Sequence, residues 1–540
     1  MKNGEIILCN NIKLDKNYEN VLSYSESSMV NLCRQHAIYT GTKYTMMDPS
    51  TNEIDIRCPY ATCIYSNYIA FNNKNVGNKW YFAFVTDIIY VNPEVTKIRY
   101  QVDVFSTWYQ RFNLNQAFIE REHVDDDTVG KHILPESVQY GDYVVSDYVE
   151  RGIFANGNRG YIIIGLSNLV EDFPVPTQNV YNGIFSGLTY YILEDATKAT
   201  QFIQTLMEAW GYDADRSIYC LFMVPREMIN ANDIEWKTGT ISGNTLSFGI
   251  LPSGLDYKEF ARINLSVGDS VNQYVPKNNK LLTYPYNYCL ATNNVGETAE
   301  YKFEDFLDGN SHFDIRGCIT VGCSIRMDPA LYKNGFFNED DPQTIIDNRR
   351  FYSYGLTCGK FPTCSWNSDA YTNWLTTNAV NTVAESAGKI VLSAGGFMSG
   401  NVALGVSSAL DAVTNVMSYG GNEEQMPDQA RGNTNSGDIL FSMSALGFSL
   451  YRMTIKAQQA KIIDEYFSRY GYKVNEVKTP NLNSRSKFNY IKVGGMDELV
   501  TGSIPASDLE TINGIFRKGV TIFHNYNDIG NYLVDNPIVE

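Results

Sequence analysis

Residues 80–109 read WYFAFVTDIIYVNPEVTKIRYQVDVFSTWY and carry the clearest structural signal in the chain. An apolar run begins at Trp80, and the residues around Asn92 and Pro93 favour a turn. Beyond the turn, polar residues alternate strictly with apolar ones: Lys97, Arg99, Gln101 and Asp103 with Ile98, Tyr100, Val102 and Val104. A period of two gives one buried and one wet face, so the pattern predicts a β-hairpin in an antiparallel sheet.

Other short apolar runs, bounded by Gly, Asn or Asp, predict further strands at residues 161–164, 190–193, 218–224 and 318–321. The 38 Tyr and 27 Phe residues also favour strands. Two helices are expected. One is capped by Asp195 and stops at Gly211, and the other runs from about Met453 to Tyr470. The fold class is therefore mainly β (α+β), with several domains of sheets and barrels, a few helices and one long hydrophobic insertion.

The formal net charge of −17 over 540 residues argues against an outer surface that grips nucleic acid, because phosphate contacts need Lys and Arg. It leaves open the passage of DNA through a repelling channel. The N-terminal sequence MKNGEIIL lacks the apolar core of a secretory signal, so folding in a reducing cytosol is expected.

The ten cysteines are expected to be reduced, buried thiols. Three pairs are near neighbours in sequence: Cys58 and Cys63, Cys318 and Cys323, and Cys358 and Cys364. None of them has CxxC spacing, and only five His are present, which argues against a zinc site.

Motifs for catalysis are missing from the sequence. It contains neither HExxH nor GxSxG, and residues 355–360 have the wrong spacing for a phosphate loop. Residues 118–127, FIEREHVDDD, form an acidic run that could bind a metal or act in acid–base chemistry. Their irregular spacing favours a solvated segment or pairing with Lys and Arg across a subunit interface. We therefore expect no enzyme, no catalytic, metal or cofactor-binding residue and no cofactor.

Residues 376–450 differ from the rest of the chain. No charged residue occurs from Ile390 to Leu410 or from Ile439 to Leu450, and a polar Gly-rich piece, residues 419–437, separates the two arms. As a helix, the first arm would be about 30 Å long, the thickness of a hydrocarbon core. Gly395 and Gly396 would weaken such a helix. Composition alone favours a buried helical hairpin; a stored, releasable membrane element is the alternative.

Four stretches carry a resemblance to a known family: residues 84–92 (FVTDIIYVN), 100–108 (YQVDVFSTW), 118–127 and 483–491 (NSRSKFNYI). They resemble the distal tail-knob protein of small short-tailed phages that replicate by protein priming. The likeness covers most of the chain and is specific at residue level from about residue 80 to 137. It implies a tail-tube-like β protein that forms a homohexameric hollow knob in the virion, at the distal tail tip.

The resemblance also implies a function for the apolar insertion. Loops from six subunits would plug the lumen and, on release, penetrate the host cytoplasmic membrane so that phage DNA passes through without specific binding. Partners would be other tail or collar proteins. The expected membrane-penetrating residues are Ile390, Val391, Leu392, Phe397, Met398, Val402, Leu404, Val406, Leu410, Val413, Val416, Ile439, Leu440, Phe441, Met443, Leu446 and Phe448.

We expect four regions: an N-terminal β domain (1–150), a central β-rich region (151–375), the hydrophobic loop (376–450) and a C-terminal helix with strands (451–540). Two other functions stay open at this point. Paired carboxylates of a cell-wall hydrolase cannot be recognised in so acidic a sequence, and a receptor-binding adhesin would have no motif of its own.

Overall fold

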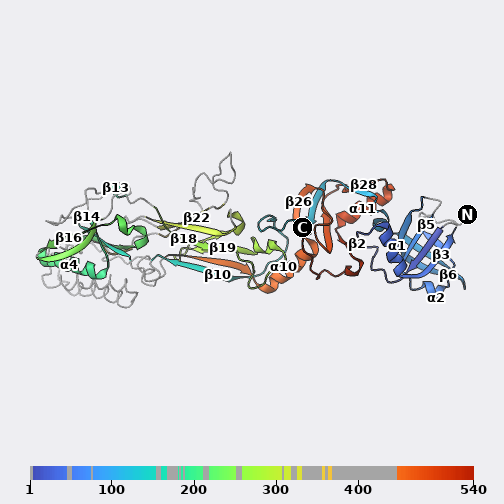
Figure 1. Cartoon of the computed structure of the whole chain (residues 1–540), viewed down its shortest axis with the longest axis horizontal. Helices are drawn as coiled ribbons and strands as arrows, with labels where there is room; N and C mark the ends of the chain where they lie inside the picture. Colours follow the sequence, from blue (N-terminus) through green and yellow to red (C-terminus); the bar gives the residue numbers. More distant parts are fainter. Residues whose placement is uncertain are drawn as a thin grey trace, which may run out of the picture. The chain divides into compact units, whose positions relative to one another are not determined.

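The computed structural model shows a chain built largely of strands (Figure 1). It describes residues 4–44, 52–73, 77–153, 160–166, 180–181, 184–185, 189–210, 218–241, 243–250, 258–306, 309–317, 325–330, 332, 355–358, 363–367 and 447–539. The chain divides into two compact units, each discontinuous in sequence. Unit 1 consists of residues 1–142, 269–286 and 455–540, and unit 2 of residues 143–268 and 287–454. The prediction of a mainly β fold is confirmed.

Unit 1 begins with a six-stranded antiparallel sheet in the order β3-β1-β5-β6-β7-β4, which curls around its own apolar core (Figure 1). Its strands are β1 (Gly4–Cys9), β3 (Ala37–Tyr44), β4 (Glu53–Ile56), β5 (Tyr68–Asn73), β6 (Trp80–Asn92) and β7 (Val95–Val102). The predicted hairpin is confirmed, because β6 and β7 pair with Ile88 opposite Ile98. Ile98 and Tyr100 are buried.

The alternating strand ends at Val102, two residues earlier than predicted. Asp103, expected on the wet face, is buried and caps the short helix α3 (Val104–Trp108). Its carboxylate accepts hydrogen bonds from the Ser106 amide (3.1 Å) and the Tyr68 hydroxyl (2.7 Å). Burial nevertheless raises the pKa of Asp103 above its usual value. The sequence did not reveal the capping role, because Asp103 also fits the alternation of polar and apolar residues.

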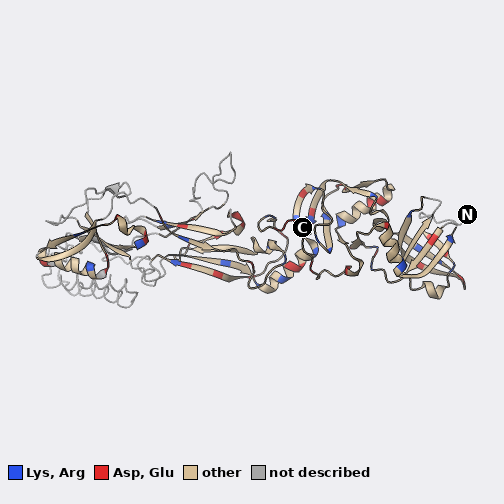
Figure 2. Cartoon of the chain, viewed as in Figure 1, with Lys and Arg blue, Asp and Glu red and all other residues tan. Residues whose placement is uncertain are grey.

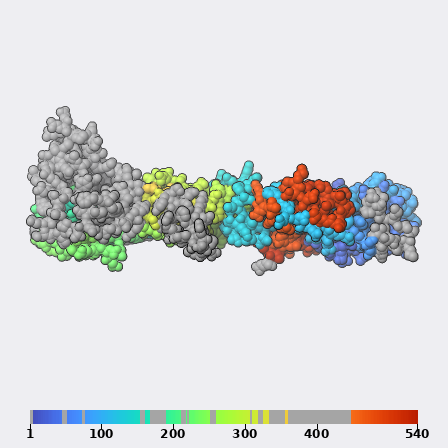
Figure 3. Space-filling model, turned by 90° about the horizontal axis from the view of Figure 1, so that it is seen from above, coloured from blue at the N-terminus to red at the C-terminus, as the bar shows by residue number. Residues whose placement is uncertain are grey.

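The second sheet of unit 1 brings the two ends of the chain together in the order β2-β29-β27-β9-β26. Its strands are β2 (Asn20–Leu22), β9 (Ala117–Glu122), β26 (Tyr472–Lys478), β27 (Phe488–Val493) and β29 (Val520–Phe523). β2 and β29 are parallel, and the other pairs are antiparallel. In Figure 3 the red residues near the C-terminus lie beside light-blue and cyan residues from the N-terminal third of the chain.

Unit 1 also contains a small sheet, further α-helices and the short 3-10 helices η3 (Asn279–Leu282) and η7 (Tyr526–Asp528). The sheet pairs β8 (Phe112–Leu114) with β28 (Val500–Gly502), and the further α-helices are α1 (Glu26–Gln35), α2 (Tyr60–Cys63), α10 (Ala457–Tyr470) and α11 (Ala506–Lys518). The second predicted helix is confirmed as α10, which ends at Gly471 as expected. Its start was placed too early, because Met453 belongs to a strand that runs from Gly447 to Ile455.

In unit 2, two four-stranded sheets enclose an apolar cluster that contains Phe448, Leu450, Cys289 and Phe313. The first has the order β10-β25-β19-β20 and the second β18-β21-β22-β23. Their strands are β10 (Tyr143–Gly152), β18 (Lys258–Leu265), β19 (Asn287–Thr292), β20 (Thr298–Tyr301), β21 (Ser311–Gly317), β22 (Ile325–Ala330), β23 (Leu356–Cys358) and β25 (Gly447–Ile455).

A six-stranded sheet, β16-β17-β14-β11-β15-β24, completes unit 2 and carries α4 (Ala196–Trp210) on one face. Its strands are β11 (Tyr161–Leu166), β14 (Thr189–Leu193), β15 (Ile218–Val224), β16 (Glu235–Ile241), β17 (Asn244–Ile250) and β24 (Thr363–Asn367); β12 (Val180–Tyr181) and β13 (Ile184–Phe185) pair separately. Three predicted strands, at 161–164, 190–193 and 218–224, are confirmed. The predicted cap is also present, since Asp195 Oδ1 accepts from the Lys198 amide at 2.9 Å. Residues 318–321 and Gly211 lie outside the described residues.

The chain enters and leaves unit 2 at one end of that unit. Asn287, the first residue of β19, pairs with Thr454 near the end of β25, and the Thr454 hydroxyl contacts Ser146 of β10. Arg452 Nη1 donates to the carbonyl of Val267, just beyond β18, at 3.0 Å. Unit 2 thus consists of two insertions in the sequence of unit 1, residues 143–268 and 287–454, whose connecting strands are joined to one another.

Phe448→Ala tests the role of β25 in this core. The Phe448 side chain has no exposed surface, so its truncation leaves a cavity and should lower the free energy of unfolding by about 3–5 kcal/mol. Denaturant unfolding measures the loss, and Met496→Ala is the control because Met496 is 89% exposed. Equal stability of the two variants would contradict the core assignment of Phe448.

Candidate functional site

The acidic run, residues 118–127, is folded into β9 and the loop that follows it. Glu120 pairs with Lys492 at 2.8 Å and Glu122 with Lys478, so β9 is linked by charge to β27 and β26. Arg121, Glu122 and His123 are buried. The expectation of a solvated segment is therefore wrong for the centre of the run, because its charges are paired within the chain. Across both units, acidic and basic residues are interspersed (Figure 2).

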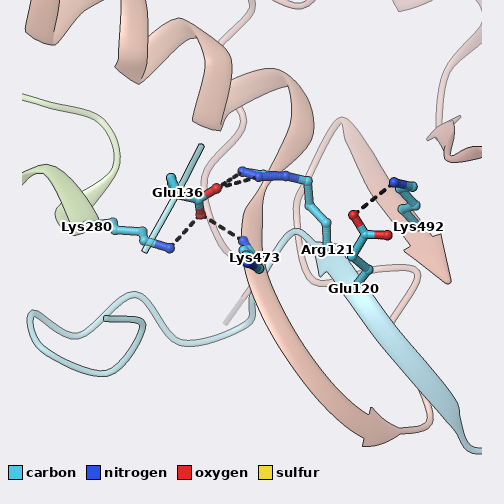
Figure 4. Close-up of polar contacts among 6 residues, drawn as sticks. All are labelled: Glu120, Arg121, Glu136, Lys280, Lys473 and Lys492. Atoms are coloured by element: carbon cyan, nitrogen blue, oxygen red, sulfur yellow. Dashed lines mark hydrogen bonds and ion pairs between the residues drawn. The ribbon is translucent and has the colours of Figure 1, made fainter. Parts of the chain in front are cut away.

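A buried cluster of polar contacts in this region centres on Glu136, which lies beyond the run (Figure 4). Its carboxylate accepts from Arg121 Nη1 at 2.8 Å and Nη2 at 2.6 Å, and from Lys280 Nζ at 2.6 Å. The Lys473 amide donates to it at 2.9 Å. At most 8% of the Arg121, Lys280 and Glu136 side chains is exposed. We call these four residues the Glu136 clasp.

Aromatic rings complete the surroundings of the clasp. The Arg121 guanidinium lies 4.8 Å from the centre of the Tyr466 ring, and Lys280 Nζ lies 5.3 Å from that of Tyr472. Burial lowers the pKa of Lys280, and the nearby Glu136 carboxylate opposes that shift. The clasp joins chain segments around residues 121–136, 280 and 466–473, which are far apart in sequence. Its geometry is that of a structural ion cluster.

Two more carboxylates in unit 1 accept several hydrogen bonds from groups within the chain. Asp127 accepts from the Tyr472 hydroxyl at 2.6 Å and the Asn279 amide at 3.1 Å. Asp464 of α10 is buried and accepts from the Tyr274 hydroxyl at 2.8 Å and from both Asn278 nitrogens. Within the described residues no three His, Cys, Asp or Glu side chains are grouped to hold a metal ion.

Ser23, His524 and Asn489 form an arrangement that the sequence did not reveal. His524 Nδ1 lies 3.0 Å from Ser23 Oγ, and the partners of the Asn489 amide turn its nitrogen towards His524 Nε2, also at 3.0 Å. Nε2 is then the acceptor, and Nδ1–H donates to Ser23. Burial lowers the pKa of His524, which keeps the ring neutral. A base for nucleophilic catalysis would have to accept the serine proton, so this polarity indicates a structural link.

Of the expected membrane-penetrating residues, one lies in the described part of the chain. Phe448 belongs to β25 and packs in the core of unit 2. All the other residues of that set, which run from Ile390 to Leu446, lie outside the described residues. In the described part of the chain, none of the helices combines the length and the apolar composition that a membrane crossing requires.

Comparisons with known proteins found matches near the N-terminus and over the C-terminal half of the chain. Residues 2–113 match the family described as the caudoviral major tail protein N-terminus, and residues 255–537 match the C-terminal domain of the Bacillus phage phi29 tail knob protein gp9. The chain is 23% identical to the phi29 tail knob protein gp9, with 94% of this chain and 93% of that protein covered. It is 22% identical to the Bacillus phage B103 tail knob protein, with 94% and 92% covered.

A solved structure has the same fold. The tail knob protein gp12 of bacteriophage C1 superposes with a TM-score of 0.67 at 15% identity, over 99% of this chain and 100% of that one. The β-rich architecture and these matches define a structural protein of a bacteriophage tail. More narrowly, the chain belongs to the tail knob protein gp9 family of phi29-like phages.

Membership of this family confirms several expectations at once. The protein is a structural component of the distal knob of the virion tail, where it associates with other tail proteins, and it is not an enzyme. The sequence reading missed Glu136, because Arg121, Lys280 and Lys473 stand at unrelated positions in sequence and no local pattern joins them. A long-range contact of this kind becomes visible only in the fold.

Glu136→Gln tests the clasp. The amide keeps the shape of the side chain but leaves Arg121 and Lys280 buried without a countercharge, which should cost about 3–5 kcal/mol of unfolding free energy. Denaturant unfolding gives the value. Asp142→Asn, which removes an exposed partner of Lys456, should leave the midpoint unchanged. Equal midpoints for the two variants would show that the clasp is dispensable.

The lowered pKa of the buried His123 side chain predicts how the stability of the protein depends on pH. Burial lowers its pKa to about 3, against an ordinary value of about 6.5 in the unfolded chain. As the pH falls below about 6.5, the unfolded state therefore takes up a proton that the folded state refuses, and stability drops by up to about 1.4 kcal/mol per pH unit.

The measurement is the unfolding free energy of wild type and His123→Gln at pH 7.5 and pH 5. The wild-type protein should lose more stability than the variant between these pH values, because Gln has no proton to gain. An identical loss in both proteins would mean that His123 does not carry the effect.

Proposed function

We propose that this protein forms a homohexameric hollow knob whose hydrophobic loops plug the distal lumen and later penetrate the host cytoplasmic membrane. The observation that carries the proposal is the uncharged sequence of residues 390–410 and 439–446, set in a chain of otherwise ordinary charge. Family membership and the resemblance of residues 84–127 support the knob, and the composition of the loop supports the membrane step.

The loop is bounded on both sides by strands of unit 2. β24 ends at Asn367 and β25 begins at Gly447. Gly447 has a φ of +151° and lies so close to β10 that an added Cβ would come 2.1 Å from the Arg151 carbonyl oxygen. Phe448 then enters the core. We therefore place the end of the proposed loop at residue 446, and firm attachment at β25 would let it leave the lumen without detaching from the knob.

The charge of the protein suits a conduit for DNA. With a net charge of −17, six copies would repel phosphates, so that DNA slides through the lumen without specific binding. The proposed partners are collar and other tail proteins on the phage side and the host cytoplasmic membrane during entry.

Deletion of residues 376–446 tests the loop. Both strands that bound the loop remain, so the knob should still assemble, whereas leakage of dye from lipid vesicles, the membrane activity expected of the loop, should be lost. Native mass spectrometry and vesicle leakage measure the two properties. A deletion that abolishes assembly, or that leaves leakage unchanged, would contradict the proposal.

Two substitutions sharpen this test without shortening the chain. Val402→Asp with Val406→Asp adds charges to the apolar arm and should reduce leakage strongly, because burying a carboxylate in lipid is costly. Val477→Asp is the matched control on the surface of β26, where Val477 is 67% exposed. Protein that binds whole cells but never disturbs vesicles would favour an adhesin.

A further inference from the structure

The four cysteines of unit 1 are buried and form two contacting pairs. Cys9 is the last residue of β1 and Cys33 lies in α1, and the Cys9 thiol donates to the Cys33 carbonyl oxygen at 3.3 Å. Cys58 stands just before α2 and Cys63 is its last residue. The Cys63 thiol donates to the Cys58 carbonyl oxygen at 3.9 Å.

All four thiols are free in this structure and at most 2% exposed. Cys289 and Cys358 of unit 2 are equally buried, but in the described part of the chain the polar contacts of Cys289 and Cys358 include no second thiol. Among the six cysteines whose side chains the structure describes, the pairing is therefore limited to the first sheet of unit 1 and its two helices. This difference gives an internal control for any oxidation of the protein.

A tail protein passes through two redox environments. It folds in a reducing cytosol, and the virion is then released into an oxidising medium, where disulfides persist. We propose that Cys9 with Cys33 and Cys58 with Cys63 are oxidation sites that become intramolecular disulfides after release. The inference does not depend on the proposed membrane role of the loop.

The reaction is thiol–disulfide exchange with a small-molecule disulfide such as glutathione disulfide. One protein thiolate attacks a glutathione sulfur, forms a mixed disulfide and releases one glutathione thiolate. The second cysteine of the pair attacks the protein sulfur of that mixed disulfide, closes the protein S–S bond and releases the second glutathione thiolate. Two cysteines are oxidised, one glutathione disulfide is reduced, and the two thiol protons pass to the glutathione thiolates.

Burial controls the rate of this step. The hydrogen bond with Cys9 and burial raise the pKa of Cys33, and burial raises that of Cys63 to about 12, so the attacking thiolate is scarce at neutral pH. Oxidation should be slow, on the timescale of local opening, and should not interfere with folding in the cytosol. Once formed, the Cys9–Cys33 bond would tie α1 to β1 and restrict the unfolded chain.

The test uses the full-length protein, reduced, desalted and incubated with glutathione disulfide at pH 8. After acid quenching, unfolding and alkylation with N-ethylmaleimide, peptide mapping identifies each cysteine. We expect loss of labelling at Cys9, Cys33, Cys58 and Cys63 with linked peptides for the two pairs, full labelling at Cys289 and Cys358, and a higher Tm after oxidation. Unchanged labelling of the four, or linkage in other combinations, would overturn the proposal.

Two variants separate the pairs from general reactivity. Cys33→Ser should abolish the Cys9 link and leave the Cys58–Cys63 link intact, whereas Cys63→Ser should do the reverse. Cys289→Ser should change neither. If a serine variant fails to fold, the peptide map of the wild-type protein still decides the question, and stable glutathione adducts at the four positions in place of linked peptides would count against the proposal.

Discussion

Glu136 holds two buried cations and one backbone amide from three distant parts of the chain, and unit 1 depends on this contact. A buried carboxylate is costly unless its charge and its hydrogen bonds are satisfied, and here Arg121, Lys280 and Lys473 supply both. Because the partners come from β9, the short segment 269–286 and β26, the clasp fixes the segments between which unit 2 is inserted. The carboxylates of Asp127 and Asp464 are likewise satisfied by hydrogen bonds, but their donors are neutral groups.

This architecture suits the proposed release of the loop, during which the rest of the subunit would have to keep its structure. The connecting strands of unit 2 are hydrogen-bonded to one another, and β25, which follows the proposed loop, lies in its central core. Phe448 and Gly447 fix the end of the loop, so its release would not require the sheets to separate. The proposed disulfides would add covalent links to the first sheet after the virion has left the cell.

Much of the fold was accessible from sequence, because its strongest signals are local. The hairpin of β6 and β7 follows from alternation, and the start of α4 follows from the capping chemistry of Asp195. The boundary errors are physical as well: Asp103 fits both a wet strand position and a helix cap, and Met453 lies in a strand that runs up to a helix. The clasp was out of reach, since its contacts join residues that no local pattern relates. The acidic run was judged by composition, which cannot show that Arg121 and Glu122 are buried.

The central claim is that six copies form a hollow knob closed by the loop, and single-particle cryo-electron microscopy of the purified full-length protein tests it most directly. The account predicts a six-fold ring with an open channel whose distal end is filled by density that is missing when residues 376–446 are deleted. A compact monomer at every concentration, or a ring whose lumen is identical with and without those residues, would contradict it.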